Sequence, residues 1–166
     1  MVGAHPDGIQ IFRSIDGLII RNNIMYDNHQ NIFLQPLSGE VMKNIEIYNN
    51  LIYHDDYDYE WPKGIWLDCG YGGAPGSMHN VKIYNNTVVS MFFGITWRGN
   101  ITDVELRNNI IANRTGVNLG MGDSSHNMSS DYNFFSNLNR IRIDWDGKTY
   151  WDHLSDYQSE TGQDLH

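Results

Sequence analysis

Two consecutive asparagines recur in the middle of the most β-prone segments of this chain, and this repeat constrains the fold more than any other feature. The phrases are LIIRNNIMY from Leu18, IEIYNNLIY from Ile45, VKIYNNTVV from Val81 and VELRNNIIA from Val104. Asparagine is depleted in strand interiors and favoured in turns. Each phrase is therefore interpreted as two strands joined by a bend at the asparagine pair.

The second asparagine of each pair marks the period of the repeat. These residues are Asn23, Asn50, Asn86 and Asn109, followed by a degenerate DYN that ends at Asn133, with spacings of 27, 36, 23 and 24 residues. The flanking segments alternate apolar and polar residues with a period of two, which is typical of strands and not of helices. A repeat of this kind indicates stacked structural units.

Two further sets of short strands complete each repeat. One set lies between the asparagine pairs and reads DGIQIF, NIFLQ, KGIWLD, FGITWR and TGVNLG, and the other follows the pairs directly as IMY, LIY, TVV, IIA and FFS. Each period of about 24 residues thus holds three strands and three bends. This pattern predicts a chain that winds round an axis, with successive coils stacked as parallel strands about 4.8 Å apart.

The asparagine pair has two expected roles in such a coil. Asparagine tolerates the left-handed backbone conformation that a tight bend needs. One asparagine of each pair also points inward, where its amide can bond the equivalent asparagines above and below and form a ladder.

The phrase [IV]x[IL]xNNx[IV], together with the strands DGIQIF (Asp7–Phe12) and KGIWLD (Lys63–Asp68), resembles the repeat of the pectate-lyase-like superfamily of parallel β-helices. The resemblance covers roughly Asp7–Asn137. It implies an all-β fold, a right-handed single-stranded parallel β-helix of about five coils. It also implies a carbohydrate-directed function and an extracellular or periplasmic location. The superfamily includes lyases, hydrolases, epimerases and phage tailspikes, so the motif specifies the fold more closely than the chemistry.

The last part of the chain departs from the repeat. IRIDWDGKTY (Ile141–Tyr150) predicts two strands about an Asp-Gly turn, and YWDHLSDYQSETG predicts a short helix that ends at Gly162. We therefore predict a single domain over 1–166, with coils over 5–137 and a hairpin and helix cap over 138–166. Such a cap would cover the last coil, whose strand edges otherwise invite aggregation.

The other end of the repeat has no comparable cap in the sequence. Nothing strand-like or helical precedes Asp7. We expect that end to be covered by Met1–Pro6, by a second copy in a homo-oligomer, or by N-terminal coils outside this sequence.

Composition excludes several partners. The 166 residues suit one domain with its own core. Eleven Lys and Arg against 20 Asp and Glu leave a net charge of −9, which argues against binding nucleic acid or an anionic membrane through a basic face.

The single cysteine, Cys69, permits neither an internal disulfide nor a CxxC metal site. The sequence has no apolar run of the roughly 20 residues that a membrane span needs and no signal-peptide pattern.

The Gly-Ile strands present the face that best fits a ligand. Aligned on their shared motif, they stack the inward residues Ile9, Ile32, Ile65, Ile95 and Val117. Their outward side chains then form two columns: Gln10, Phe33, Trp66, Thr96 and Asn118; and Phe12, Gln35, Asp68, Arg98 and Gly120. A third set stands at the entrance of the strands: Asp7, Gln30, Lys63, Phe93 and Thr115. Aromatic rings mixed with amides and charges are what sugars need, because C–H faces stack on rings while hydroxyls bond polar groups. We expect a polysaccharide to bind here, through His5, Asp7, Gln10, Phe33, Gln35, Trp66 and Asp68.

Two cations on this face indicate a polysaccharide lyase. In β-elimination from a uronate polymer, a base removes the proton α to the carboxylate while a positive charge neutralises that carboxylate. Lys63 is the predicted base and Arg98 the predicted neutralising group. An ion pair between Arg98 and its column neighbour Asp68 is the alternative. A glycoside hydrolase ranks lower, because Asp7 and Asp68 are expected roughly 18–20 Å apart at strand geometry, farther than two hydrolytic carboxyls.

The longest spacing, from Asn50 to Asn86, contains loops on both sides of the KGIWLD strand. The first loop, YHDDYDYEWP, holds four carboxylates that could bind Ca²⁺ (calcium) through oxygen ligands: Asp55, Asp56, Asp58 and Glu60. A solvated acidic loop is the alternative. The sequence therefore predicts a polysaccharide-binding β-helix that acts as a lyase. The competing hypothesis is a non-catalytic sugar-binding or structural segment, such as part of a tailspike or adhesin.

Overall fold

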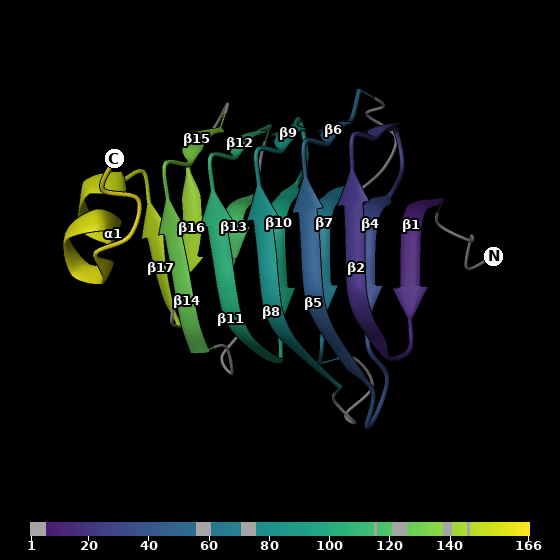
Figure 1. Ribbon diagram of the computed structural model, residues 1–166. Helices are drawn as coiled ribbons and strands as arrows, with labels where there is room; N and C mark the ends of the chain where they lie inside the picture. The colour runs from purple at the N-terminus through teal and green to yellow at the C-terminus, as the bar shows by residue number, and fades with distance from the viewer. Residues whose placement is uncertain are drawn as a thin grey trace.

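The computed structural model describes residues 6–55, 61–70, 76–114, 116–120, 126–137, 141–145 and 147–166. The chain is built from strands, with one short helix, and the strands form three stacked sheets (Figure 1). All strand pairs are parallel except the last, so the architecture is compatible with the predicted parallel β-helix. No helix in the described residues is long and apolar enough to cross a membrane.

From β1 to β15, consecutive strands go to sheets A, B and C in turn, so each set of three adds one strand to every sheet, and β16 and β17 both join sheet A. Sheet A contains, in spatial order, β1 (Asp7–Phe12), β4 (Gln30–Gln35), β7 (Lys63–Asp68), β10 (Phe93–Arg98), β13 (Val117–Gly120), β16 (Arg142–Trp145) and β17 (Lys148–Trp151). Sheet B contains β2 (Ile15–Arg21), β5 (Val41–Tyr48), β8 (Ser77–Tyr84), β11 (Asn100–Arg107) and β14 (His126–Asp131). Sheet C contains β3 (Ile24–Tyr26), β6 (Leu51–Tyr53), β9 (Thr87–Val89), β12 (Ile110–Asn113) and β15 (Phe134–Asn137).

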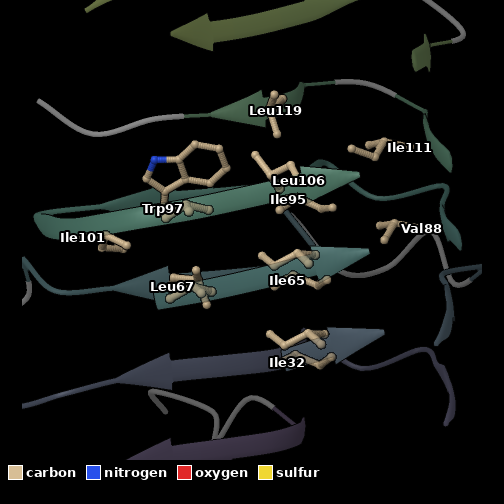
Figure 2. Close-up of a cluster of buried hydrophobic side chains, with 14 of the residues drawn as sticks. Ile32, Ile65, Leu67, Val88, Ile95, Trp97, Ile101, Leu106, Ile111 and Leu119 are labelled. Atoms are coloured by element: carbon tan, nitrogen blue, oxygen red, sulfur yellow. The ribbon is translucent and has the colours of Figure 1, made fainter. Parts of the chain in front are cut away.

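The core lies between the three sheets and consists of the inward residues of each strand. In sheet A, the buried side chains of Ile32, Ile65, Ile95 and Leu119 stack one above another (Figure 2). This stacking follows from the parallel register, which places equivalent positions of successive strands about 4.8 Å apart.

The predicted register is confirmed from β1 to β10 and wrong at β13. The structure pairs Phe93 with Val117 and Ile95 with Leu119, so the last strand is shifted by two residues from its predicted alignment. The cause is Gly116, which is not a strand residue. It has a φ of 75° in the preceding turn, and a Cβ there would lie 2.2 Å from the Phe92 carbonyl oxygen.

This shift corrects the expected position of Asn118. It is fully buried, and its side-chain N–H groups donate to the carbonyl oxygens of Ile111 and Ser136. It therefore lies inside the coil and not on the outward face. Gly120 pairs with Thr96 instead of following Arg98.

The asparagine ladder is confirmed. The side-chain N–H of each second asparagine donates to the Oδ1 of the next, at 2.9 Å from Asn23 to Asn50, 2.9 Å from Asn50 to Asn86, 3.0 Å from Asn86 to Asn109 and 2.9 Å from Asn109 to Asn133. The same Oδ1 also accepts the backbone N–H of the preceding asparagine.

The first asparagine of each pair supplies the bend. These residues have left-handed φ values: Asn22 58°, Asn49 54°, Asn85 55° and Asn108 54°. The two asparagines of each pair therefore have different roles, because the first turns the backbone and the second forms hydrogen bonds between coils.

The C-terminal hairpin and helix form as predicted. β16 and β17 pair antiparallel, and α1 (Leu154–Thr161) ends at Gly162, whose φ is 67°. Tyr157 of α1 is fully buried against Trp145 and Tyr150. The helix closes one end of the stack of sheets, at the left of Figure 1.

The opposite end of the stack is open in the described part of the chain. β1, β2 and β3 are terminal strands of their sheets (right of Figure 1). Four core-facing side chains of this end are only partly buried, whereas their equivalents in the next strands are fully buried. The partly buried residues are Ile9, Ile11, Ile15 and Leu18.

Candidate functional site

The outward face of sheet A carries a shallow groove of about 390 Å³. It runs over β1, β4, β7 and the end of β10, and its walls are the side chains that the predicted columns bring together. They are Gln10, Phe12, Gln30, Phe33, Gln35, Lys63, Trp66, Asp68 and Arg98. The groove thus contains both predicted catalytic residues and five of the predicted binding residues, Gln10, Phe33, Gln35, Trp66 and Asp68.

Asp7 lies beside this groove. It begins β1, in the column that continues through Gln30 to Lys63. Its carboxylate raises the pKa of Lys63, in opposition to burial. Asp7 therefore contributes to the electrostatics of the groove.

The floor of the groove holds an ion pair between Asp68 and Arg98. The guanidinium donates from Nε to Oδ1 at 2.6 Å and from NH2 to Oδ2 at 2.7 Å. Asp68 is 2% exposed and also accepts from the Gln35 side chain at 3.3 Å and from the Gly70 backbone at 3.0 Å. This ion pair is the alternative role that the sequence analysis gave for Arg98. In it, the guanidinium binds a carboxylate of the protein itself.

The environment of Asp68 favours its charged form. Burial alone would raise the pKa of the carboxyl, but the Arg98 guanidinium and the Gly70 N–H more than offset this effect. The pKa of Asp68 therefore lies below its ordinary value, and the pair stays ionised at neutral pH.

Lys63 places its ammonium among aromatic rings. Its Nζ lies 5.1 Å from the Trp66 ring centroid and 5.8 Å from that of Phe93, within cation–π range. The backbone of Lys63 is fixed on one side, where its N–H donates to His29 and its carbonyl accepts from Asn31. Burial lowers the pKa of Lys63, and Arg98 contributes in the same direction.

The aromatic rings of the groove pack on one another edge to face. Phe12 contacts Phe33 edge to face at 6.2 Å, and Trp66 contacts Phe93 edge to face at 5.7 Å. Trp66 is half-buried and Phe33 more deeply so. The arrangement can stack sugar rings, bond hydroxyls through the glutamine amides and pair with an anion at Lys63.

Sequence reasoning missed two aromatic residues next to this groove. Trp61 lies almost parallel to Phe92, with 5.2 Å between ring centroids and 15° between planes. The available signal was a tryptophan next to a proline at the end of the long acidic loop, but nothing in the sequence paired it with Phe92.

Most of the expected calcium ligands cannot be placed. Asp56, Asp58 and Glu60 lie outside the described residues, as does His5. Asp55 is exposed, and its backbone N–H donates to the Asp27 side chain at 2.8 Å. The described residues contain no group of three or more His, Cys, Asp or Glu side chains that could hold a metal ion.

Comparison with known proteins finds no relative of this chain. The chain matches no protein-family model, no curated protein and no solved structure at a significant level.

Proposed function

We propose that the chain is a right-handed parallel β-helix of about five coils, of the pectate-lyase-like kind, and that it binds a uronate-containing polysaccharide in the groove on sheet A. Connections between parallel strands are right-handed in nearly all proteins, which favours this hand for the coil. The observation that carries the binding proposal is the Lys63 ammonium held beside the half-buried Trp66 ring within a groove lined by amides.

A uronate sugar complements each part of this groove. Its carboxylate would pair with Lys63, the second cation among the described groove walls besides Arg98, which Asp68 already holds. Its ring face would stack on Trp66. The hydroxyls would bond the amides of Gln10 and Gln35.

Elimination chemistry is the catalytic form of this proposal. Neutral Lys63 would take the proton α to the uronate carboxylate. The electron pair of that C–H bond would form the new C=C bond, and the glycosidic oxygen would leave and take a proton from water. The lowered pKa of Lys63 supports this role, because a base must be neutral to accept a proton. Ca²⁺ held by Asp55, Asp56, Asp58 and Glu60 would supply the neutralising charge that Arg98 gives to Asp68.

A non-catalytic binding module is the second candidate. The tight pairing of Arg98 with Asp68 favours it, because that cation is occupied before a substrate arrives. A glycoside hydrolase has less support. Asp68 is the only carboxylate among the described groove walls, and it is buried and paired.

One assay separates these functions. The protein is incubated with pectate, alginate and glycosaminoglycans, with and without Ca²⁺, while binding is measured by calorimetry and the unsaturated uronate product by ultraviolet absorbance. A lyase produces absorbance that Lys63→Ala abolishes, whereas a binding module shows heat without absorbance. Lys82→Ala, a change on the exposed face of sheet B, is the matched control and should leave both signals unchanged. Absence of binding to every polymer would reject the proposal.

The open end of the stack completes the proposal. We expect a second copy in a homo-oligomer, or a further coil, to cover β1, β2 and β3. The ladder supports this, since Oδ1 of Asn23 occupies the position that accepts an N–H from a neighbouring coil at every later asparagine.

A further inference from the structure

Trp61 has an unusual backbone conformation for an exposed aromatic residue. Its φ is 71°, a left-handed value that is an outlier for a bulky residue and costs free energy. Its side chain nevertheless remains 56% exposed. Strain of this kind persists only where surrounding structure imposes it, and it is concentrated at functional sites.

The neighbouring coils impose this conformation. The carbonyl of Pro62 accepts N–H groups from Phe92 and Phe93, both at 3.0 Å, and the Lys63 N–H donates to His29 at 2.8 Å. The chain directly after Trp61 is therefore bonded to the strands on both sides of it. The bend that leads into β7 therefore determines where the indole lies.

The indole has a rigid support. One of its faces lies on Phe92, and Phe92 in turn lies against Gly116, where a Cβ would come within 2.8 Å of the phenyl ring. With one face packed and more than half of the side chain in solvent, Trp61 presents its other face outward. A fixed, exposed aromatic plate of this kind is suited to stacking a sugar ring.

Ring contacts connect this plate to the groove. The Phe93 ring lies 6.4 Å from Trp61 and 5.7 Å from Trp66, and it also lies 5.8 Å from the Lys63 ammonium. Trp61 and Trp66 are thus separated by a single phenyl ring. That separation fits nearby sugars of one chain.

We propose that Trp61 is a second sugar-stacking platform and that the ligand is an oligosaccharide extending from Trp66 past Lys63 onto Trp61, across the start of β7. The inference rests on the proposed carbohydrate-binding function. It extends that function by fixing a minimum ligand length and the direction in which the ligand leaves the groove.

The test compares ligand lengths. Uronate oligosaccharides of two to six units, from pectate and from alginate, are titrated calorimetrically into the wild-type protein and into variants. Trp61→Ala should weaken binding of the longer oligosaccharides about three- to ten-fold, the usual value of one aromatic stack, and leave disaccharide binding unchanged. Trp61→Phe should retain most of the affinity, while Trp66→Ala should weaken binding at every length.

Trp151→Ala is the matched control, because Trp151 is a partly exposed tryptophan on β17, the far edge strand of sheet A. It should change binding at no length. Equal binding of all lengths by Trp61→Ala and wild type overturns the platform while the proposed function stands. An equal loss at every length also overturns it, because Trp61 would then only support the Lys63 site. Failure of the wild type to bind any oligosaccharide rejects both proposals.

Discussion

At the scale of single residues, the groove depends on the buried carboxylate of Asp68. Asp68→Asn removes the negative charge that pairs with the Arg98 guanidinium beside Trp66. We expect a loss of about 2 kcal/mol in the free energy of unfolding, below the usual cost of breaking a fully buried pair because Arg98 is partly exposed. Urea denaturation measures the loss.

Asp16→Asn is the control for this change. Asp16 pairs with Lys43 on the surface, where ion pairs contribute little, so the same substitution there should leave the free energy of unfolding nearly unchanged. Equal effects at the two positions would contradict the structural role of Asp68.

The Asp68 pair also has a pH signature. The pKa of this carboxyl is lower in the folded than in the unfolded chain, so its contribution to stability is complete above the unfolded value of about 3.9 and is lost as pH falls through the folded value. We expect Asp68→Asn to reduce the acid-dependent loss of stability below about pH 4. The measurement is the urea midpoint of unfolding of the wild type and of Asp68→Asn at several pH values around pH 4. Parallel pH curves for the two proteins would contradict a stabilising role of the Asp68–Arg98 pair.

Several features of the groove follow from sequence alone. The columns of β1 to β10 could be aligned because each strand keeps one inward isoleucine, and the alignment brought Asp68 next to Arg98. The position of Trp61 could not be predicted, because its left-handed backbone is contrary to the preference of tryptophan and the next residue, Pro62, is held by hydrogen bonds from a distant part of the chain. The number of ring contacts to Lys63 likewise depends on rotamers, which sequence patterns do not specify.

At the scale of elements, the asparagine ladder adds a continuous row of side-chain hydrogen bonds to the backbone pairing between coils. Asn86→Ala removes an acceptor for both N–H groups of Asn50 and the donors to Asn109 and to the Ile47 carbonyl. Because these groups are buried and would lose their partners, we expect a loss of about 3 kcal/mol in the free energy of unfolding.

The adjacent residue provides the control. Asn85 only turns the backbone, at a φ of 55°, and glycine adopts this conformation without steric cost. Asn85→Gly should therefore change stability by only a few tenths of a kcal/mol, by about the amount that glycine adds to unfolded-chain entropy. Similar losses for the two variants would mean that the two asparagines do not divide their roles.

The C-terminal segment ends the ladder with a carboxylate side chain, which accepts hydrogen bonds from Asn133. Asp164 is buried after α1, and its Oδ1 accepts the backbone and side-chain N–H groups of Asn133, as a further asparagine would. Its Oδ2 accepts from Ser130 and Tyr157. A carboxylate is well suited to this position, because the groups of Asn133, Ser130 and Tyr157 that face it all donate hydrogen bonds.

We expect Asp164→Ala to cost about 2 to 3 kcal/mol and Asp164→Asn to cost about 1 kcal/mol. Asparagine keeps the acceptor for Asn133, and the hydroxyl groups of Ser130 and Tyr157 can rotate to accept from its amide. The Tm values of the two variants and the wild type, measured by thermal unfolding, give the order of the stability losses. A larger loss for Asp164→Asn would show that the charge, and not the ladder geometry, determines stability at this end.

At this scale, sequence predicted the repeating elements and failed at one register. The ladder and the helix end at Gly162 were predictable because asparagine and glycine have specific backbone preferences. The shift at β13 was not, because TGVNLG matches the Gly-Ile motif while Gly116 turns the chain instead of entering the strand. A local motif cannot distinguish a glycine within a strand from one that precedes it.

At the scale of the whole molecule, the two ends of the stack differ. One end is covered by the antiparallel pair of β16 and β17, by α1 and by the acceptor of Asp164. The other presents the edges of β1, β2 and β3 and the partly exposed core side chains above them. Strand edges of this kind pair readily with other chains, so the open end is the expected contact for a second copy.

Adjacent residues of β2 provide a test of this contact. Leu18 faces the core at the open end and is partly exposed, whereas Ile19 points outward and is 59% exposed. If copies associate through this end, Leu18→Lys places a charge in the contact, and its long side chain can still reach solvent in the monomer. We expect the wild type to associate with rising concentration, Leu18→Lys to remain monomeric, and Ile19→Lys to behave as the wild type in sedimentation experiments. If association survives Leu18→Lys but is lost in Ile19→Lys, the contact lies on the outer face of sheet B instead. A wild type that stays monomeric at every concentration would reject the homo-oligomer and leave a further coil as the expected cover of this end.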